Sequence, residues 1–194
     1  MKKALAFLMA AVMLMSMLTA CGNKDNAADN NDADNNNVNT EETDKAAADK
    51  VAALIDAIYV QERTEETDAQ CEAAKAAWDA LTDAQKALVD TGDASKDDPR
   101  NQDEIGEKEL LVVSFGTSFN DSRVADIKSV EDALQEANPD WSVRRAFTAQ
   151  IIINHIQARD GEKIDNMEQA LERAVANGVK QLVVQPTHLM HGAE

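Results

Sequence analysis

The stretch Gln181-Leu-Val-Val-Gln-Pro-Thr-His-Leu-Met-His-Gly192 decides the fold, because it joins a strand to a loop that carries histidines. Residues 181–185 predict a buried strand, and Pro186 ends it. His188 follows where the strand opens into a loop. In open α/β sheets, ligands bind at the edge formed by the carboxyl ends of the strands. The stretch therefore predicts both a strand and one part of a candidate site.

Two further strands are expected upstream of this stretch. Leu110–Phe115 is an apolar run without clean alternation, as for a parallel strand covered on both faces, and Trp141–Phe147 is a second strand. Segments with apolar residues at helical spacing separate the three strands. We expect a βαβαβ unit with a parallel sheet and right-handed crossovers. The strand ends would then place three segments around one crevice: Ser114–Phe119, Phe147–Gln150 and Thr187–His191.

The residue types at this crevice leave the chemistry open. Neither G-x-x-x-x-G-K-[ST] nor G-x-G-x-x-G is present, and no serine lies in a G-x-S-x-G elbow. His188 and His191 could both bind a metal if they lay on a helix, but Pro186 and Gly192 argue against a helix. A solvated loop histidine and a metal ligand therefore both remain open readings of His188. His155 lies among isoleucines at helical spacing and is expected on a helix face.

The chain begins with features of an exported lipoprotein. Residues 1–20 combine a basic start with a short apolar run, as in a secretory signal peptide. They end in Leu18-Thr-Ala-Cys21, a lipobox in which Cys21 would carry the lipid. An ordinary signal with a chance cysteine is the alternative. We expect an extracytoplasmic protein that the lipidated Cys21 anchors to a bacterial cell membrane.

The composition bears on possible partners and on the structure of residues 21–43. The formal net charge of −17 makes nucleic-acid binding unlikely on electrostatic grounds. Residues 21–43 are rich in Asn and Asp and nearly free of apolar residues, which predicts a disordered tether. With Cys21 used by the lipid, Cys71 has no partner for an intrachain disulfide and is expected to be a small buried residue.

A small all-α module is expected before the α/β part. Residues 44–92 are alanine-rich with apolar residues at helical spacing, and Thr82 with Gln85 fits a capping box. The module lacks a cluster suited to metal or nucleophilic chemistry, so a spacer or interaction role is the default. Residues 93–107 are polar and predict a linker at a domain boundary.

Three separate segments carry a resemblance to a known family. They are Glu109-Leu-Leu-Val-Val-Ser-Phe-Gly-Thr-Ser-Phe-Asn-Asp-Ser-Arg123, Val143-Arg-Arg-Ala-Phe-Thr-Ala-Gln-Ile-Ile152 and Val183-Val-Gln-Pro-Thr-His188. In this order they resemble the anaerobic cobalt chelatases of cobalamin biosynthesis, the sirohydrochlorin cobaltochelatases. The resemblance covers residues 108–194. It implies a chelatase-like α/β fold with two similar halves and a tetrapyrrole cleft, of which this sequence matches the first half.

The resemblance also implies roles for particular residues. His188 matches the family's first-half histidine, which binds the metal and helps to remove pyrrole protons, so it is our candidate catalytic residue and metal ligand. The substrate-binding candidates are Gly116, Thr117, Ser118, Phe119 and Arg145. Co(II) would be the substrate metal and sirohydrochlorin or a related tetrapyrrole the other substrate, with no organic cofactor. The activity would be that of a lyase-type chelatase.

The sequence departs from the family in one respect. The family's other metal ligands, a glutamate and a second histidine, have no counterpart here, and one histidine holds a divalent ion poorly. We therefore expect either the front part of a longer protein or a homo-oligomer that rebuilds the cleft. The alternatives to an enzyme are an extracytoplasmic protein that captures a tetrapyrrole, haem or metal without catalysis, and an inert product.

Overall fold

The computed structural model describes residues 32–58, 64–90 and 92–188 of the chain. The chain divides into two compact units, residues 1–38 and residues 39–194. The described part of the first unit, residues 32–38, is helical. The second unit contains the sheet and the helices discussed below.

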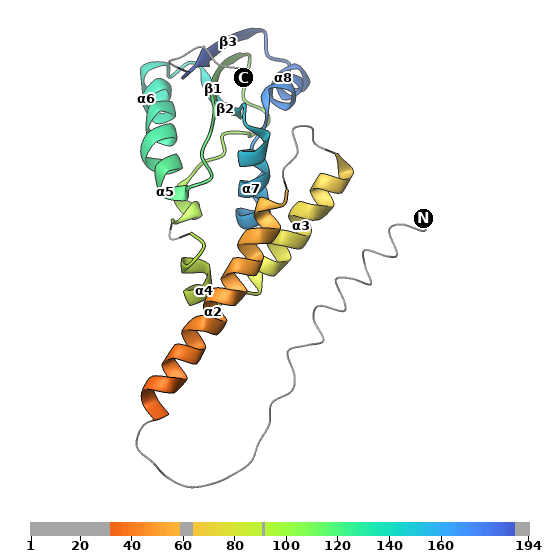
Figure 1. Ribbon diagram of the computed structural model, residues 1–194. Coiled ribbons are helices and arrows are strands. Elements are labelled where there is room, and N and C mark those ends of the chain that lie inside the picture. The colour runs from red at the N-terminus through yellow and green to blue at the C-terminus, as the bar shows by residue number, and fades with distance from the viewer. Residues whose placement is uncertain (1–31, 59–63, 91, 189–194) are drawn as a thin grey trace, which may run out of the picture. The chain divides into compact units, whose positions relative to one another are not determined.

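The second unit is built on a three-stranded sheet with the order β2-β1-β3. The strands are β1 (Lys108–Ser114), β2 (Ser142–Phe147) and β3 (Gln181–Pro186), and both pairs are parallel (Figure 1). This confirms the predicted α/β class with a parallel sheet. The register sets Ser114 opposite Phe147 and Val113 opposite Pro186. All three carboxyl ends therefore lie at one edge.

Helices cover the two faces of β1. The chain from β1 to β2 forms α5 (Asn120–Ser122), η3 (Arg123–Lys128, a π-helical segment) and α6 (Ser129–Ala137). The chain from β2 to β3 forms α7 (Gln150–Asp160) and α8 (Met167–Ala176). Leu110 and Val112 pack with Leu134 of α6, whereas Leu111 and Val113 pack with Ala170 of α8. Alternate residues of one apolar strand thus enter two separate cores, as expected for a strand covered on both sides.

The prediction that β3 is buried was wrong. Leu182, Val183 and Val184 are 37%, 45% and 45% exposed. The sequence pattern indicates an apolar strand, but burial depends on which elements pack on it. Within the described residues, β3 lies at the edge of the sheet and pairs with β1 alone.

One helix start also differs from the prediction made from sequence. The pattern of Asp165 followed three residues later by Glu168 predicts a capping box, but the N-cap of α8 is Asn166, which forms a capping box with Gln169. Asp165 is instead paired with Arg173, with 2.6 Å between Oδ2 and Nε. Asp165 therefore pairs with the guanidinium of Arg173, eight residues later on α8, and does not cap the helix.

In the described part of the chain, three α-helices precede the sheet in sequence: α2 (Asp32–Asp56), α3 (Glu65–Asp79) and α4 (Asp83–Ala87). A short 3-10 helix, η2 (Ala94–Lys96), follows them. The helix α2 begins inside the segment for which the sequence predicts a tether. The predicted capping box of Thr82 and Gln85 is present. Val51, Ile55, Cys71 and Ala74 share a core with Ala158 of α7, and Cys71 is fully buried as predicted. The part of α2 in the second unit and the helix α3 therefore pack against α7.

The predicted signal peptide, Cys21 and residues 22–31 of the expected tether lie outside the described residues. None of the helices in the described ranges combines the length and the apolar character that a membrane crossing requires. The helix α2 illustrates this, because its 25 residues carry many acidic and amide side chains.

Candidate functional site

Segments that follow the three strands meet at the carboxyl edge of the sheet. The Thr148 N–H donates to the Ser114 carbonyl at 2.9 Å, and the Thr187 N–H donates to the Val113 carbonyl at 2.9 Å. These bonds continue the parallel pairing past the ends of the strands. They bring the Nε2 atom of His188 to 3.5 Å from the Oγ1 atom of Thr148. The half-buried His188 thus lies beside the residue that follows β2, as the predicted crevice requires.

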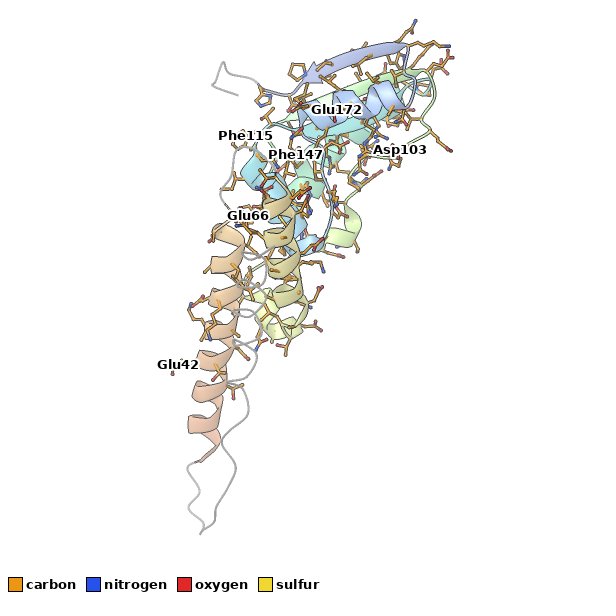
Figure 2. The ribbon with its side chains drawn as sticks, turned by 90° about the vertical axis from the view of Figure 1, so that its right-hand side faces the viewer. Glu42, Glu66, Asp103, Phe115, Phe147 and Glu172 are labelled. Atoms are coloured by element: carbon orange, nitrogen blue, oxygen red, sulfur yellow. The ribbon has the colours of Figure 1, made fainter. Side chains whose placement is uncertain are left out.

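The loop Gly116–Phe119, which we call the β1 loop, follows β1 at the same edge. Gly116 has φ +96°, and its α-carbon lies against the buried ring of Phe147. The Phe119 N–H donates to the Thr117 hydroxyl at 3.2 Å. Phe119 and Phe115 are 66% and 46% exposed. Phe115 and Phe147 lie at the same end of the sheet (Figure 2). The loop therefore presents aromatic surface outward from a fixed base.

Gly116→Ala is expected to lower the free energy of unfolding by about 1–3 kcal/mol. A side chain at φ +96° is strained, and its Cβ atom would lie 2.6 Å from Cδ2 of Phe147. Urea unfolding followed by circular dichroism measures the loss. Gly178→Ala is the matched control, because Gly178 has φ +71° but no atom within 4 Å of the added Cβ. Equal losses in the two variants would show that the contact with Phe147 contributes nothing.

Arg145, a candidate substrate-binding residue, lies in a buried ion-pair network. Its guanidinium donates to Glu131 from Nε and Nη2 at 2.9 and 2.8 Å. It also donates to Asp97 from Nη1 and Nη2 at 2.8 and 2.9 Å. The side chain is fully buried, and the charge and hydrogen bonds of these carboxylates outweigh burial and raise its pKa. Its donors are thus directed at carboxylates and not at the crevice.

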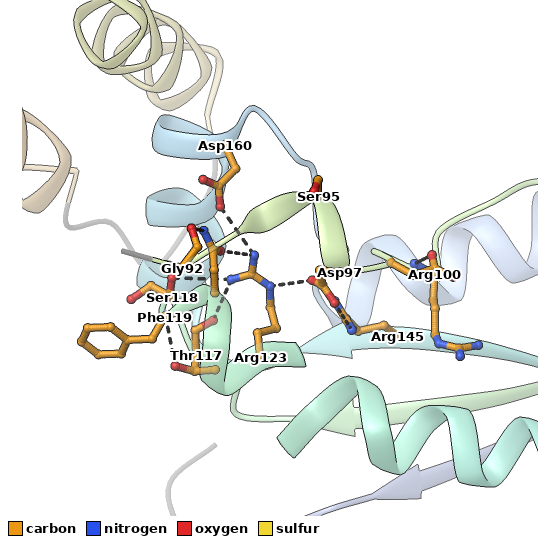
Figure 3. A network of polar contacts seen from close by, with 12 residues as sticks. Gly92, Ser95, Asp97, Arg100, Thr117, Ser118, Phe119, Arg123, Arg145 and Asp160 are labelled. Carbon is orange, nitrogen blue, oxygen red and sulfur yellow. Dashed lines mark hydrogen bonds and ion pairs between the residues drawn. The ribbon is translucent and has the colours of Figure 1, made fainter. Parts of the chain in front are cut away.

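A second buried arginine, Arg123, joins this network to the β1 loop (Figure 3). Its Nε atom donates to Asp97 at 2.6 Å, and its Nη1 atom donates to the carbonyls of Thr117 and Ser118 at 3.3 and 3.5 Å. Burial alone would raise the pKa of Asp97, but the hydrogen bonds and charges of Arg145 and Arg123 outweigh it and lower this pKa. Asp97 is therefore an anion held between two cations. The sequence analysis did not identify Asp97 or Arg123.

The other two histidines are His155, which lies on α7, and His191, which lies outside the described residues. His155 is half-buried on α7, 3.8 Å from Oδ1 of Asp56. Burial lowers its pKa, and Asp56 only partly opposes this. It lines a pocket of about 220 Å³ together with Ser118 and Phe119 of the β1 loop. His191 lies outside the described residues.

Among the described residues, His188 is the candidate metal ligand at the crevice. Within residues 32–58, 64–90 and 92–188, no three His, Cys, Asp or Glu side chains are grouped so that they could hold a metal ion. His188 supplies one imidazole at the edge of the sheet.

The parallel sheet of this α/β protein carries an imidazole, hydroxyls and exposed aromatic rings at its carboxyl edge, the edge where ligands bind in open α/β sheets. Residues 108–194 match the family model described as Cobalt chelatase (CbiK). The same segment is 41% identical over 87 residues to the sirohydrochlorin cobaltochelatase of Salmonella typhimurium. That match covers 45% of this chain and 33% of the relative, so the chain spans about a third of the relative's length. No solved structure matches the chain significantly.

The α/β segment, residues 108–194, is thus similar in sequence to the cobalt chelatases. Residues 32–107, which carry α2, α3, α4 and Asp97, lie outside the match. The match ends beyond His188 and includes the whole β1 loop. The family relationship therefore applies to the residues that meet at the edge of the sheet.

Proposed function

We propose that the protein takes part in the insertion of Co(II) into sirohydrochlorin or a related tetrapyrrole. The observation that carries this proposal is the match of residues 108–194 to the cobalt chelatases, with His188 beside Thr148 at the sheet edge. The exposed rings of Phe115 and Phe119 support it, because a flat macrocycle can stack on aromatic surface.

Metal insertion requires a proton acceptor and a short-lived metal ligand. A divalent ion replaces two pyrrole N–H protons of the macrocycle, so two protons must leave for each ion that enters. A neutral imidazole can bind Co(II) through one ring nitrogen, or accept one of these protons near neutral pH. His188 is the candidate for both roles, and Thr148 would orient its ring. No organic cofactor is needed for this exchange of protons for a metal ion.

The direct test follows the absorption spectrum of sirohydrochlorin after Co(II) is added to the full-length protein. Faster formation of the cobalt complex than in protein-free buffer supports the proposal. Tight binding of sirohydrochlorin without acceleration would favour the alternative function, extracytoplasmic capture of a tetrapyrrole. Absence of both binding and acceleration would refute both functions.

We further propose that the protein acts outside the cytoplasm, anchored through a lipid on Cys21. The support is the basic start, the apolar run and the lipobox Leu18-Thr-Ala-Cys21 in the sequence. This location also motivates the capture alternative, because an extracytoplasmic protein would meet tetrapyrroles outside the cell.

Cys21→Ser is expected to move the protein from the membrane fraction to the soluble fraction, because serine offers no thiol for the lipid. Fractionation followed by immunoblotting measures this shift. Cys71→Ser is the control, since Cys71 is buried in the second unit. Retention of the Cys21→Ser variant in membranes would contradict lipid anchoring at this position.

A further inference from the structure

Asp90 and Asp97 lie before the family-matching segment, yet each contacts a buried arginine that reaches the β1 loop. We propose that Asp97 and Arg123 are positioning residues that hold the β1 loop in the conformation that receives the tetrapyrrole. This inference rests on the proposed function for the identity of the ligand. The positioning itself rests on contacts within the protein.

Arg123 connects the acidic segment to the loop with one planar group. Asp97 accepts from its Nε atom, while its Nη1 atom donates to the carbonyls of Thr117 and Ser118. Its Nη2 atom donates to Oδ1 of Asn120 at 2.5 Å (Figure 3). The guanidinium is rigid, so fixing one edge against Asp97 fixes the direction of the other donors. Arg123 also lies in a π-helical segment, a feature that occurs often at functional sites.

A second arginine, Arg159, also connects a carboxylate before residue 108 to the β1 loop. Arg159 donates from Nη2 to the Ser118 carbonyl at 2.7 Å and to Asn120 at 2.8 Å. Its Nη1 atom is 2.5 Å from Oδ2 of Asp90, which follows α4. The side-chain amide of Asn120 donates to the Gly92 carbonyl at 3.4 Å. Each arginine therefore has a carboxylate partner before residue 108 and a carbonyl partner in the β1 loop.

This arrangement fixes which groups the loop can offer to a ligand. The carbonyls of Thr117 and Ser118 are directed at buried cations and are unavailable, while the Phe119 ring is left exposed. Ile55 and Asp56 of α2, and Val89 after α4, line the 220 Å³ pocket together with Ser118 and Phe119. The preceding segment thus both anchors the loop and forms part of the wall beside it.

The first test measures loop order without any tetrapyrrole. Arg123→Lys keeps the charge beside Asp97 but removes the planar fork that reaches the loop. Amide hydrogen exchange in residues 115–120 of the full-length protein, followed by mass spectrometry, should become about tenfold faster or more. Arg100→Lys is the matched control, because Arg100 is a buried arginine that pairs with Glu131 and Asp132 and does not contact the loop. Unchanged exchange in Arg123→Lys, or an equal increase in both variants, would overturn the positioning role.

The second test measures sirohydrochlorin binding by its absorption change. Arg123→Lys should raise Kd by about tenfold or more, since the loop must then be ordered on binding, whereas Arg100→Lys should leave Kd nearly unchanged. If Arg123→Lys does not fold, Asp97→Asn weakens the same anchoring of Arg123 and is taken through both measurements. Faster loop exchange combined with no binding by the unaltered protein would retain the positioning role and reject the ligand. Unchanged exchange in the variant combined with sirohydrochlorin binding by the unaltered protein would reject the positioning role and retain the ligand.

Discussion

Asp97→Ala is expected to lower the free energy of unfolding by about 3–5 kcal/mol, the usual cost of removing one partner from a buried ion pair. The Asp97 side chain is fully buried and pairs with both Arg123 and Arg145. After its removal Arg145 keeps Glu131, but the nearest carboxylate to Arg123 is that of Asp160, 3.5 Å from Nη2. A buried cation would therefore lose most of its compensation. Urea unfolding followed by tryptophan fluorescence and circular dichroism measures the loss.

Two further variants separate charge compensation from other causes. Asp79→Ala removes only the exposed partner of Lys75 and should change the free energy of unfolding far less. Arg123→Met added to Asp97→Ala should restore part of the stability, because the uncompensated cation is then absent. The loss of unfolding free energy in the double variant should be smaller than the sum of the losses in Asp97→Ala and Arg123→Met measured separately. A loss equal to that sum would contradict this explanation.

The stability difference between the unaltered protein and Asp97→Asn should also depend on pH. The pKa of Asp97 is lower in the folded protein than its ordinary value of 3.8. Its contribution is therefore complete above pH 3.8 and is lost as the pH falls through the folded pKa. The two unfolding curves should converge in acid and stay separated at neutral pH. A separation that persists unchanged into acid would rule out the ionised carboxylate as its cause.

His188→Ala is expected to reduce the rate of protein-assisted cobalt insertion by about 100-fold or more, the usual effect of losing a proton-transferring side chain. The variant removes the described imidazole at the crevice, whether it binds the metal or accepts a proton. The change should leave unfolding almost unaltered, because the side chain is half-buried and its contact with Thr148 is long, at 3.5 Å. Initial rates of the absorption change at saturating sirohydrochlorin give the measurement.

Variants at His155 and Thr148 serve as controls for this result. His155→Gln removes an imidazole that lies on α7 beside Asp56 and should leave insertion close to that of the unaltered protein. Thr148→Val removes the hydroxyl that contacts His188 and should lower the rate less than His188→Ala does. Unchanged insertion in His188→Ala would exclude this residue from the chemistry.

The sheet and the position of its functional edge could be predicted from the sequence, because both follow from local patterns. Apolar runs at Leu110–Phe115, Trp141–Phe147 and residues 181–185 indicated three strands with their carboxyl ends together, and the register confirms this. The exposure of β3 could not be predicted, since it depends on its place in the order of strands. Parallel pairing alone allows β3 to be central or at the edge.

The buried charges could not be located from the sequence because their partners are distant along the chain. Asp97 and Arg145 are 48 residues apart, and Asp97 lies in a polar segment that indicates a linker. One signal was present: Arg144 and Arg145 are adjacent in an otherwise apolar strand. Adjacent residues of a strand point to opposite faces, so in a covered strand at least one arginine must find a carboxylate inside the protein. The pattern predicts that such a partner exists but does not identify it.

The pairing of Asp97 with Arg123 and Arg145 limits how the two parts of the chain can diverge. A mutation that neutralises Asp97 leaves surplus positive charge in the interior, and a mutation at either arginine alters the balance again. Substitutions at position 97 are therefore expected to covary with substitutions at 123 and 145. A family member without residues 44–107 would need a different internal anion, or uncharged side chains at these two positions. We therefore expect the segment before the sheet and the chelatase-like segment to be inherited together.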